Sequence, residues 1–498
     1  MSIAERYPAA MRTLQAVGQS GGQSGGQSAG QSHVLDGFDR LDERRQLHLL
    51  DQIESIDWPE VTRLVRTHVL AKPKFALPQR VEPAPWYPYK PGTEKLKKKY
   101  AEARRAGEQL IREGKVAAFT VAGGQGTRLG WDAPKGTFPA TPIRKTPLFV
   151  CFAEYLQKVR EKYGRAVPWY IMTSPANDAA TRDFFESNAY FGLKPEDVSL
   201  FPQAMLPAFD IVTGKALLEA PGSLALSPNG HGGSLKALHT SGALDDMKKR
   251  GVEQISYIQV DNPIVKVIDP LFLGLHALDG AQMSSKMLPK AFPKEKLGNI
   301  CLIDGKVGVI EYSDLPDDLA EQRTADGELR FRAGSIAIHV LRVDFVESLN
   351  TAAEGFALPF HRAEKKVAHW DAGVGATGAT IEPKKPNAVK LETFVFDALP
   401  LCEKSIVYET DRVEEFAPIK NADDPDPAKC VDSPVTSKAI QVERAARWLE
   451  RHGVKVERDT NGATRAVIEI SPCVAIEAAD LAKVKLPARI AAGETVLI

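Results

Sequence analysis

The chain has 498 residues, a length typical of about three domains, and 43% of them are hydrophobic, which is enough for a large core. Because 64 basic residues balance 64 acidic ones, the charge argues against binding to nucleic acid or to an anionic membrane. The five cysteines are scattered without a C-x-x-C pair and no apolar run approaches the ~20 residues that span a bilayer, so we expect a soluble cytoplasmic protein without disulfides or a zinc site.

Residues 1–90 are predicted to form an N-terminal helical segment that contains a linker. Residues 18–32 repeat Gly-Gln-Ser with a single alanine as their apolar side chain, which is typical of a flexible linker. Leucine and isoleucine then recur at helical spacing among charged residues over 39–70. Prolines at positions 83, 85 and 88 indicate a second linker at the end of this segment.

Helices and strands alternate over residues 91–425, where we expect the central domain. The predicted helices span 93–113, 146–163, 177–188 and 234–250. The predicted strands span 116–122, 168–173 and 254–260. This alternation predicts a mainly parallel sheet that is covered on both faces and binds ligands beyond the carboxyl ends of its strands.

The later part of the chain has shorter elements. Residues 300–312 are predicted to form a hairpin around Asp304-Gly305, and further strands are expected at 335–341 and 405–410. A charged helix at 438–452 belongs to a small C-terminal domain, which we place at 426–498.

A glycine-rich loop follows the first predicted strand of the central domain. Four glycines lie among the ten residues 121–130, so backbone N–H groups can come close to a ligand. Arg128 and Lys135 add two positive charges to the same segment. A strand, a glycine turn and two cations predict a site for a polyphosphate.

Two common nucleotide motifs do not fit this loop. A P-loop requires Gly-Lys-Ser/Thr, whereas Lys135-Gly136-Thr137 has the reverse order. A dinucleotide-binding fingerprint requires a third glycine where this chain has Leu129, which argues against an NAD-dependent oxidoreductase. The loop therefore indicates a different class of nucleotide-binding protein.

Residues 122–130, together with Pro134-Lys135-Gly136, resemble the signature of the eukaryotic-type UTP:sugar-1-phosphate uridylyltransferases. Six further blocks resemble the UDP-N-acetylhexosamine pyrophosphorylase branch in the same order: 169–174, 201–207, 260–262, 334–339, 392–397 and 420–423. The resemblance implies a glycosyltransferase-A-like α/β core, with a doubly wound, mainly parallel sheet and small N-terminal helical and C-terminal α+β domains.

The resemblance also implies an activity and its substrates. A sugar 1-phosphate, with N-acetylglucosamine 1-phosphate the best candidate, would attack the α-phosphorus of UTP and release pyrophosphate. Because two anions must approach each other, positive charge is needed and a covalent nucleophile is not. Arg128 and Lys135 would be the catalytic cations, and Asp261, at a strand end, would bind Mg²⁺. We expect a monomer or weak oligomer.

The positions of other residues within the matching blocks imply contacts with the two substrates. The implied nucleotide-binding residues are Ala122, Gly123, Gly124, Gln203, Gly230, Asp261 and Lys390. The implied sugar-phosphate-binding residues are His231, Glu311, Ser335, Phe394, Phe396 and Lys420.

Some of these residues have an ordinary structural alternative. Asp261 could instead begin a turn or cap a helix. The glycine cluster at 229–233 could be a plain loop before a helix. Phe394 and Phe396 would alternate on one strand face, where they could be core residues or walls of the sugar pocket.

Two positions depart from the N-acetylhexosamine branch, which carries asparagine where this chain has His231 and Ser335. An amide offers a donor and an acceptor to the acetamido group, and losing such a contact can change specificity strongly. Glucose 1-phosphate, or a broad set of sugar 1-phosphates, is therefore the alternative substrate. A non-catalytic nucleotide-sugar-binding protein is a further alternative, although it would not need Arg128, Lys135 and Asp261 together.

Overall fold

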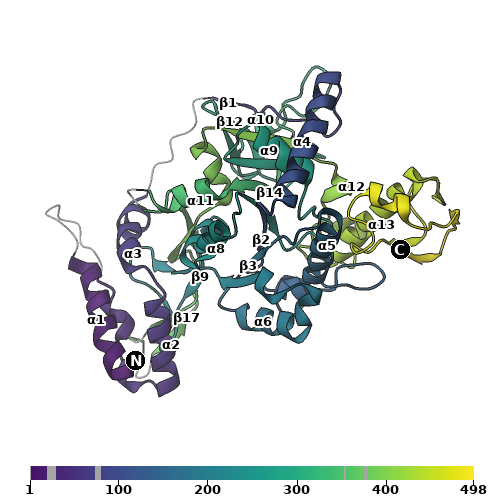
Figure 1. Ribbon diagram of the computed structural model, residues 1–498. Coiled ribbons are helices and arrows are strands. Elements are labelled where there is room, and N and C mark those ends of the chain that lie inside the picture. Colours follow the sequence, from purple (N-terminus) through teal and green to yellow (C-terminus); the bar gives the residue numbers. More distant parts are fainter. Residues whose placement is uncertain (1, 20–29, 73–79, 353–354, 372, 375–377) are drawn as a thin grey trace. The chain divides into compact units, whose positions relative to one another are not determined.

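The computed structural model describes residues 2–19, 30–72, 80–352, 355–371, 373–374 and 378–498 (Figure 1). The chain forms two compact units. Unit 1 comprises residues 1–77, 203–234 and 358–395, and unit 2 comprises residues 78–202, 235–357 and 396–498. Each unit is therefore assembled from separated stretches of sequence. The expected domains at 1–90, 91–425 and 426–498 follow chain order instead, and they stay a prediction.

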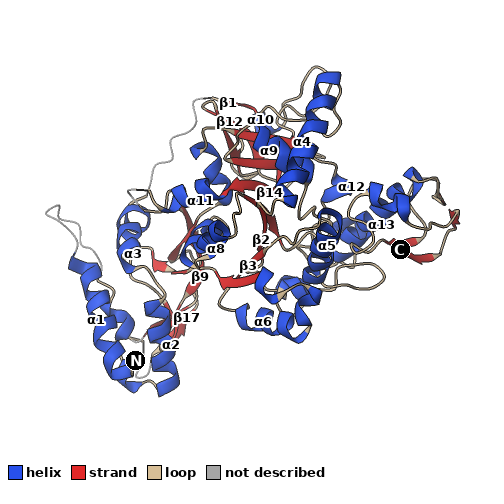
Figure 2. Cartoon of the chain, in the orientation of Figure 1, coloured by secondary structure: helices blue, strands red, loops and turns tan. Residues whose placement is uncertain are grey.

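In the described residues, unit 2 is built on a ten-stranded sheet (Figure 2). Its core has four neighbouring parallel strands: β10 (Gln254–Gln259), β2 (Val116–Val121), β3 (Trp169–Thr173) and β4 (Val198–Pro202). Most residues of the first three are buried, as expected for parallel strands that are covered on both faces. This arrangement confirms the predicted α/β class and its doubly wound, mainly parallel core.

The remaining strands of the sheet pair mostly antiparallel. Strand β14 (Ala333–Arg342) pairs with β10, β11 (Met283–Pro289) and β12 (Asn299–Ile303). β11 also pairs in parallel with β19 (Ser405–Glu409). The predicted hairpin is confirmed, because β12 and β13 (Lys306–Ile310) flank Asp304 and Gly305, whose φ angles of 49° and 86° suit a tight hairpin turn.

The expected second linker is wrong where it contains Pro83. The strand β1 (Val81–Pro83) pairs antiparallel with β12 and so adds an edge to the sheet, and Tyr87 forms an isolated bridge with Tyr408. A proline is tolerated at such a place because an edge strand leaves one row of N–H groups unpaired.

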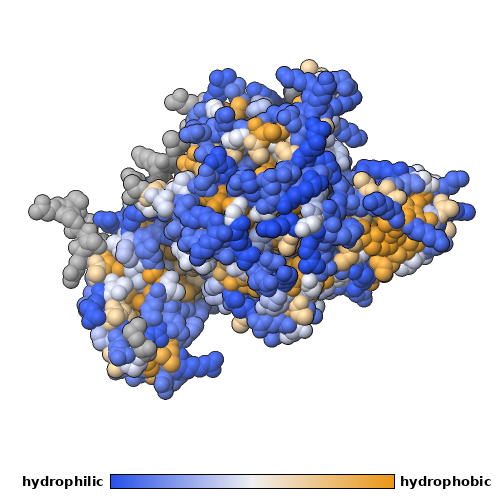
Figure 3. Space-filling model, viewed as in Figure 1, coloured by the Kyte–Doolittle hydropathy of each residue, from blue (hydrophilic) through white to orange (hydrophobic). Residues whose placement is uncertain are grey.

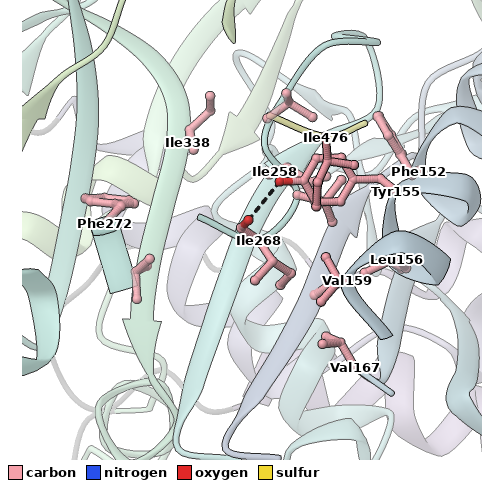
Figure 4. Packing of buried hydrophobic residues seen from close by; sticks show 14 of the residues in the cluster. Phe152, Tyr155, Leu156, Val159, Val167, Ile258, Ile268, Phe272, Ile338 and Ile476 are labelled. Atoms are coloured by element: carbon pink, nitrogen blue, oxygen red, sulfur yellow. Dashed lines mark hydrogen bonds between the residues drawn. The ribbon is translucent and has the colours of Figure 1, made fainter. Parts of the chain in front are cut away.

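Three helices pack on one side of the sheet: α4 (Glu94–Arg112), α5 (Leu148–Tyr163) and α9 (Pro270–Leu278). Part of this core is seen in Figure 4, where Phe152, Leu156 and Val159 of α5 contribute side chains. Two glycines bring α4 and α9 close together, since a Cβ on Gly107 would lie 1.8 Å from the Pro270 carbonyl oxygen and one on Gly274 would lie 1.6 Å from that of Ala103.

Other helices complete unit 2. On the opposite side of the sheet, Tyr170 of β3 donates a hydrogen bond to Asp246 of α8 (Ala243–Lys249), and α8 contacts α11 (Val343–Asn350). The helix α6 (Asp178–Ser187) follows β3 as predicted. The single helix expected at 234–250 is wrong: α7 (Gly233–Thr240) ends before Gly242, whose φ of 79° breaks the helix ahead of α8.

The C-terminal part of unit 2 has its own small core around α13 (Pro434–Arg451). This helix begins earlier than predicted because Ser433 and Thr436 form a capping box in front of Pro434. The short helix α12 (Arg412–Glu415) precedes it, and the strand pairs β20 (Lys455–Val456) with β22 (Arg489–Ile490) and β21 (Val467–Glu469) with β23 (Thr495–Leu497) follow. Figure 3 shows apolar surface over this segment, where Val467 and Leu497 are exposed.

Unit 1 combines N-terminal helices with strands from later in the chain. Its helices are α1 (Ile3–Gln19), α2 (Glu43–Glu54) and α3 (Trp58–Leu64). They share a core with strands from later in the chain: β5 (Met205–Pro207), β6 (Phe209–Asp210), β7 (Leu218–Ala220), β8 (Ser223–Leu224), β9 (Leu226–Pro228), β16 (His369–Asp371) and β18 (Ala388–Glu392). Two more strands extend the sheets of this unit, since β15 (His361–Lys365) pairs with β18 and β17 (Ala379–Ile381) pairs with β16.

The predicted helices over 39–70 are confirmed. The predicted Gly-Gln-Ser linker lies mostly outside the described residues. Residues 18–19 end α1 and so are not linker, and residues 20–29 lie outside the described residues. Within the described residues, no helix combines the length and apolar character needed to cross a membrane.

Candidate functional site

The glycine-rich loop leaves the carboxyl end of β2, as predicted, and is held by hydrogen bonds within unit 2. The backbone N–H of Ala122 donates to Met172 of β3 at 2.8 Å. The side chain of Asn177 donates to the carbonyl oxygens of Ala122 and Gly124, at 3.0 and 3.2 Å. The backbone N–H of Lys135 also donates to Gly124, at 3.2 Å. These bonds fix the path of the loop and the position of the Lys135 backbone.

The glycines of this loop serve different purposes. A Cβ on Gly136 would lie 2.0 Å from the Phe149 ring, and one on Gly126 would lie 2.7 Å from the Trp131 carbonyl oxygen. These two glycines are therefore required by packing. A Cβ on Gly124 would meet nothing within 4 Å, so its backbone is open to an approaching ligand. The open segment at Gly124 is the part that fits the expected nucleotide contact.

The two expected catalytic cations, Lys135 and Arg128, lie on the same loop but in different turns and with different exposure. Lys135 begins a 3-10 turn at Lys135–Thr137, and its side chain is 15% exposed. Arg128 lies in the 3-10 turn Thr127–Leu129 and is exposed. Burial lowers the pKa of Lys135, and the positive charges of Lys420 and Arg128 lower it further against the attraction of Asp261. This clustering of cations favours an anionic ligand.

Asp261 lies just beyond β10, opposite the start of the glycine loop. The register that pairs Gln259 with Val121 brings the two strand ends together, and Lys135 Nζ lies 3.9 Å from Asp261 Oδ2. The expected alternative of a helix cap does not apply, because α9 is capped by Asp269, whose side chain accepts from Leu271. The structure therefore brings Lys135 and Asp261 together, as the sequence led us to expect.

The chemistry of Asp261 suits a cation ligand. Its side chain is 12% exposed, and in the described part of the chain its carboxylate accepts no hydrogen bond. Oxygen lone pairs are thus left for a hard cation such as Mg²⁺, which binds one or two carboxylates and keeps phosphate and water ligands. Among the described residues, no group of three or more histidine, cysteine or acidic side chains could hold a metal ion by itself. Phosphate oxygens would have to complete the shell.

Lys420 reaches this region on a segment that is bonded to the end of β10. The backbone N–H of Ile419 donates to the carbonyl oxygen of Asp261 at 2.8 Å. Asn262 adds two bonds: its Nδ2 donates to the Glu415 carbonyl at 2.7 Å, and its Oδ1 accepts from the N–H of Ala417 at 3.1 Å. These bonds place Lys420 next to the same strand end as Asp261.

Asp432 is a carboxylate beside Lys420 that the sequence did not reveal. Its carbonyl oxygen accepts from the backbone N–H of Lys420 at 2.6 Å, and its Oδ2 lies 3.7 Å from Lys420 Nζ. Burial raises the pKa of Asp432, the ammonium of Lys420 opposes this, and the nearby charge of Asp261 raises it further. No motif signals such a residue, because its place beside Lys420 depends on how the chain folds back between positions 420 and 432.

A buried ionic cluster supports the Lys420 segment from behind. Lys286, whose side chain has no exposed surface, donates to Asp269 at 2.6 Å and to Glu415 at 2.5 Å. Thr410 donates to the second oxygen of Glu415 at 2.8 Å. Burial opposes ionisation of Asp269, but the ammonium groups of Lys286 and Lys266 overcome this and lower its pKa. The carboxyl of Asp269 is thus kept ionised, and the hydrogen bonds of the cluster hold α12, which leads to Lys420.

Two expected sugar-binding residues of unit 2 flank one glycine. A Cβ on Gly298 would lie 3.7 Å from Glu311 Oε1 and 3.8 Å from Ser335 Cβ. Glu311 follows β13, and Ser335 lies in β14 with its N–H donating to Gly298 at 2.8 Å. Phe396, a third expected member, is buried in the 3-10 segment Val395–Leu401. The structure thus brings Glu311 and Ser335 together.

In unit 1, the second glycine cluster packs against the segment that follows β18. Gly230 has a φ of 82°, and a Cβ there would lie 2.3 Å from the Thr393 carbonyl oxygen. A Cβ on Gly232 would lie 2.7 Å from the backbone of Phe394, and Thr393 N–H donates to Asn229 at 2.8 Å. Close backbone packing is therefore one reason for these glycines, as the plain-loop alternative anticipated.

His231 is held in one protonation state by this packing. Its Nδ1 accepts from the backbone N–H of Val395 at 3.1 Å, so the neutral ring must carry its proton on Nε2. Burial, assisted by the charge of His361, lowers the pKa of His231 to about 4. The ring of Phe394 packs against those of both His231 and His361, with centroid distances of 5.3 and 4.6 Å. His231 therefore acts as a neutral donor through Nε2.

Further expectations concern Phe394, Lys390 and Gln203 of unit 1 and Phe396 of unit 2. Phe394 and Phe396 do not alternate on a strand, because β18 ends at Glu392 and a 3-10 segment begins at Val395. Lys390 lies in β18 opposite Ala363, and Gln203 is buried just before β5. The pairing of β18 with β15 ends where the chain turns to pack against the glycine cluster. The alternation of side chains in the sequence could not indicate this end.

Comparisons with known proteins give matches over most of the chain. Residues 79–477 match the protein family described as UTP–glucose-1-phosphate uridylyltransferase. The chain is 39% identical to UDP-N-acetylhexosamine pyrophosphorylase-like protein 1 from Xenopus tropicalis over 391 residues, 74% of each protein. It is 37% identical to UDP-N-acetylglucosamine pyrophosphorylase from Saccharomyces cerevisiae, over 72% of this chain and 75% of the yeast protein.

A solved structure is similar over nearly the full length. The crystal structure of the uridine diphosphate N-acetylglucosamine pyrophosphorylase from Trypanosoma brucei in complex with inhibitor has a TM-score of 0.78 and 25% identity. The alignment covers 97% of this chain and 94% of that one.

Proposed function

The chain belongs to the UTP–glucose-1-phosphate uridylyltransferase family, and we propose that it transfers the uridylyl group of UTP to N-acetylglucosamine 1-phosphate with release of pyrophosphate. One observation supports this type of reaction above the others. The ends of β2 and β10 lie side by side, so that Lys135 of the open glycine loop comes within 3.9 Å of Asp261, which follows β10. The names of the yeast and trypanosome relatives support the choice of sugar.

The proposed reaction exchanges one phosphorus–oxygen bond for another. An oxygen of the sugar phosphate forms a bond to the α-phosphorus of UTP, while the bond from that phosphorus to the bridging oxygen of pyrophosphate breaks. Lys135 and Arg128 would neutralise the charge that collects on the leaving pyrophosphate. Because Lys135 is largely shielded from water, its charge would act more strongly than that of a solvated lysine. Lys420 would bind the incoming phosphate.

We further propose Mg²⁺ as the cofactor, with Asp261 as its protein ligand. The ion would supply positive charge that neutralises and aligns the phosphates. Support comes from the Asp261 carboxylate, which is mostly buried and within the described residues accepts no hydrogen bond. Cytoplasmic location and a monomeric or weakly associated state stay predictions.

His231 of unit 1 and Ser335 of unit 2 are two positions that we expect to influence the choice between sugars, each within its own unit. Through Nε2, His231 offers one hydrogen-bond donor, which suits the carbonyl of an acetamido group but also a sugar hydroxyl. Ser335 lies beside Glu311, whose carboxylate can accept from hydroxyl groups. Neither side chain offers the paired donor and acceptor of an amide. Glucose 1-phosphate is therefore the second candidate.

The reaction type is tested with Lys135→Ala and the exposed α4 variant Lys98→Ala as a matched control. Pyrophosphate release from UTP, Mg²⁺ and N-acetylglucosamine 1-phosphate should fall about 10²–10³-fold in Lys135→Ala, as for loss of one preorganised donor in other enzymes. Lys98→Ala should match the unaltered protein, and both should melt at similar temperatures. Undiminished turnover in folded Lys135→Ala would contradict the proposal.

A further inference from the structure

Unit 2 contains a cavity of about 490 Å³ that the proposed reaction does not use. It is bordered by side chains from α4, α5, α9, β19 and the last residue of α13. The cavity has an apolar part, where Tyr155 of α5 donates to the Ile268 carbonyl at 2.8 Å and Ile476 lies beside its ring (Figure 4). A cavity of this size can hold a small organic ligand.

Most charged groups that line the cavity already have partners. Arg104 and Lys162 both bond to Glu477, at 2.7 and 2.5 Å, and Arg451 bonds to a carboxylate of α12 at 2.9 Å. Asp269 accepts a hydrogen bond from the buried ammonium of the ionic cluster at 2.6 Å. Both carboxylates of the lining are thus engaged, so the cavity is poorly suited to a cationic ligand.

Lys266 differs from these groups. It lines the cavity and is half-buried and, among the described residues, it makes no ion pair and no hydrogen bond. Burial disfavours its charge, but the carboxylates of Asp269 and Glu415 overcome this and raise its pKa. A charged group with three N–H donors therefore borders a cavity and has no hydrogen-bond acceptor among the described residues. Donors that are partly withdrawn from bulk water gain from an acceptor, and an anion is the acceptor that also matches the charge.

Neighbouring side chains define the rest of the ligand. Lys90, which is exposed, brings a second ammonium to the same cavity, and Tyr89 brings a phenol. Tyr155 and Tyr163 also line it, so aromatic rings meet the body of any occupant. A phosphate group pairs well with two ammonium groups, and a flat apolar body packs well against tyrosine rings.

We propose that this cavity is a second anion-binding site, in which Lys266 and Lys90 bind the phosphate of a small organic phosphate whose aromatic or apolar body packs against the tyrosines. The site lies outside the glycine loop and shares none of Arg128, Lys135, Asp261 or Lys420. The ligand is therefore a binding partner distinct from the two substrates of the proposed reaction.

Phenyl phosphate is a suitable probe because it combines one phosphate with one ring. Its binding to the full chain is measured by calorimetry in the presence of saturating UDP-N-acetylglucosamine, and again without it. The variants are Lys266→Met, the rim variant Lys90→Met, the catalytic-loop variant Lys135→Ala and the control Lys98→Met. Melting temperatures show which variants are folded, and Lys90→Met at the exposed rim keeps the test valid if Lys266→Met does not fold.

One probe per chain is expected, with binding weakened tenfold or more in Lys266→Met and severalfold in Lys90→Met. Lys135→Ala and Lys98→Met should bind like the unaltered protein. Unchanged binding in folded Lys266→Met and Lys90→Met, or no saturable binding at millimolar probe, would overturn the proposal. Binding lost in Lys135→Ala would place the probe on the glycine loop and overturn it as well. Because Lys135→Ala removes the proposed activity but not this site, failure of one proposal is distinguishable from failure of the other.

Discussion

Asn262 gives a direct test of how Lys420 is held in place. Its amide makes two buried hydrogen bonds to the segment that leads to Lys420, at 2.7 Å to the Glu415 carbonyl and 3.1 Å from the Ala417 N–H. Asn262→Ala removes both bonds and a longer one of 3.4 Å from the Ile264 N–H, so three buried backbone groups lose a partner. At about 1 kcal/mol for each net bond, and more for groups left unsatisfied, the expected loss of unfolding free energy is about 2–4 kcal/mol.

The kinetic effect should fall on one substrate. A displaced Lys420 would lose a charge-assisted contact of about 1.5–3 kcal/mol with the sugar phosphate, which corresponds to a roughly 10–100-fold lower kcat/KM for that substrate. The KM for UTP should change little, because the loop that carries Lys135 is held by Asn177 instead.

The assay is pyrophosphate release with each substrate varied in turn, together with a denaturant titration. Asn188→Ala is the matched control, because it removes an asparagine bond of 2.8 Å at the end of α6. The positioning role of Asn262 would be refuted if folded Asn262→Ala kept its kcat/KM for the sugar phosphate. It would also be refuted if kcat/KM fell by the same factor for both substrates.

Three further predictions concern packing, pH and specificity. Gly136→Ala should cost about 1–3 kcal/mol of stability, since its Cβ would overlap an aromatic ring, whereas Gly124→Ala should unfold like the unaltered protein in denaturant but bind UTP more weakly. Burial lowers the pKa of His276 to about 3, so between pH 6.5 and pH 3 the unfolded chain binds a proton that the folded chain does not. The free energy of unfolding, measured by urea titration, should therefore fall by about 2 kcal/mol from pH 7 to pH 5. The decrease should be smaller in His276→Gln. The double variant His231→Asn, Ser335→Asn should raise the preference for N-acetylglucosamine 1-phosphate over glucose 1-phosphate, measured as a ratio of kcat/KM values; an unchanged ratio would exclude these positions as specificity determinants.

The parts of the site that the sequence predicts are those that depend on local pattern and on parallel-strand geometry. The apolar run before the glycine loop identifies β2, and the rule that ligands bind beyond strand ends predicts that Lys135 and Asp261 meet, although they are far apart in the chain. The fold class follows from the same alternation of helices and strands.

Other features depend on contacts that no local pattern reveals. Asp432 acquires its role from packing beside Lys420, and the glycines near Gly230 are required by the backbone of Thr393. Phe394 follows a strand pattern in the sequence, but the strand ends at Glu392 where the chain packs against that glycine cluster. Tertiary packing overrides local propensity at each of these places.

The most direct test of the central claim measures pyrophosphate release from UTP with N-acetylglucosamine 1-phosphate and glucose 1-phosphate side by side, with Mg²⁺ and with chelator. The account predicts turnover that requires Mg²⁺ and favours the N-acetyl sugar. Turnover that favours glucose 1-phosphate would contradict the choice of substrate, and the absence of turnover with either sugar would contradict the proposed reaction itself.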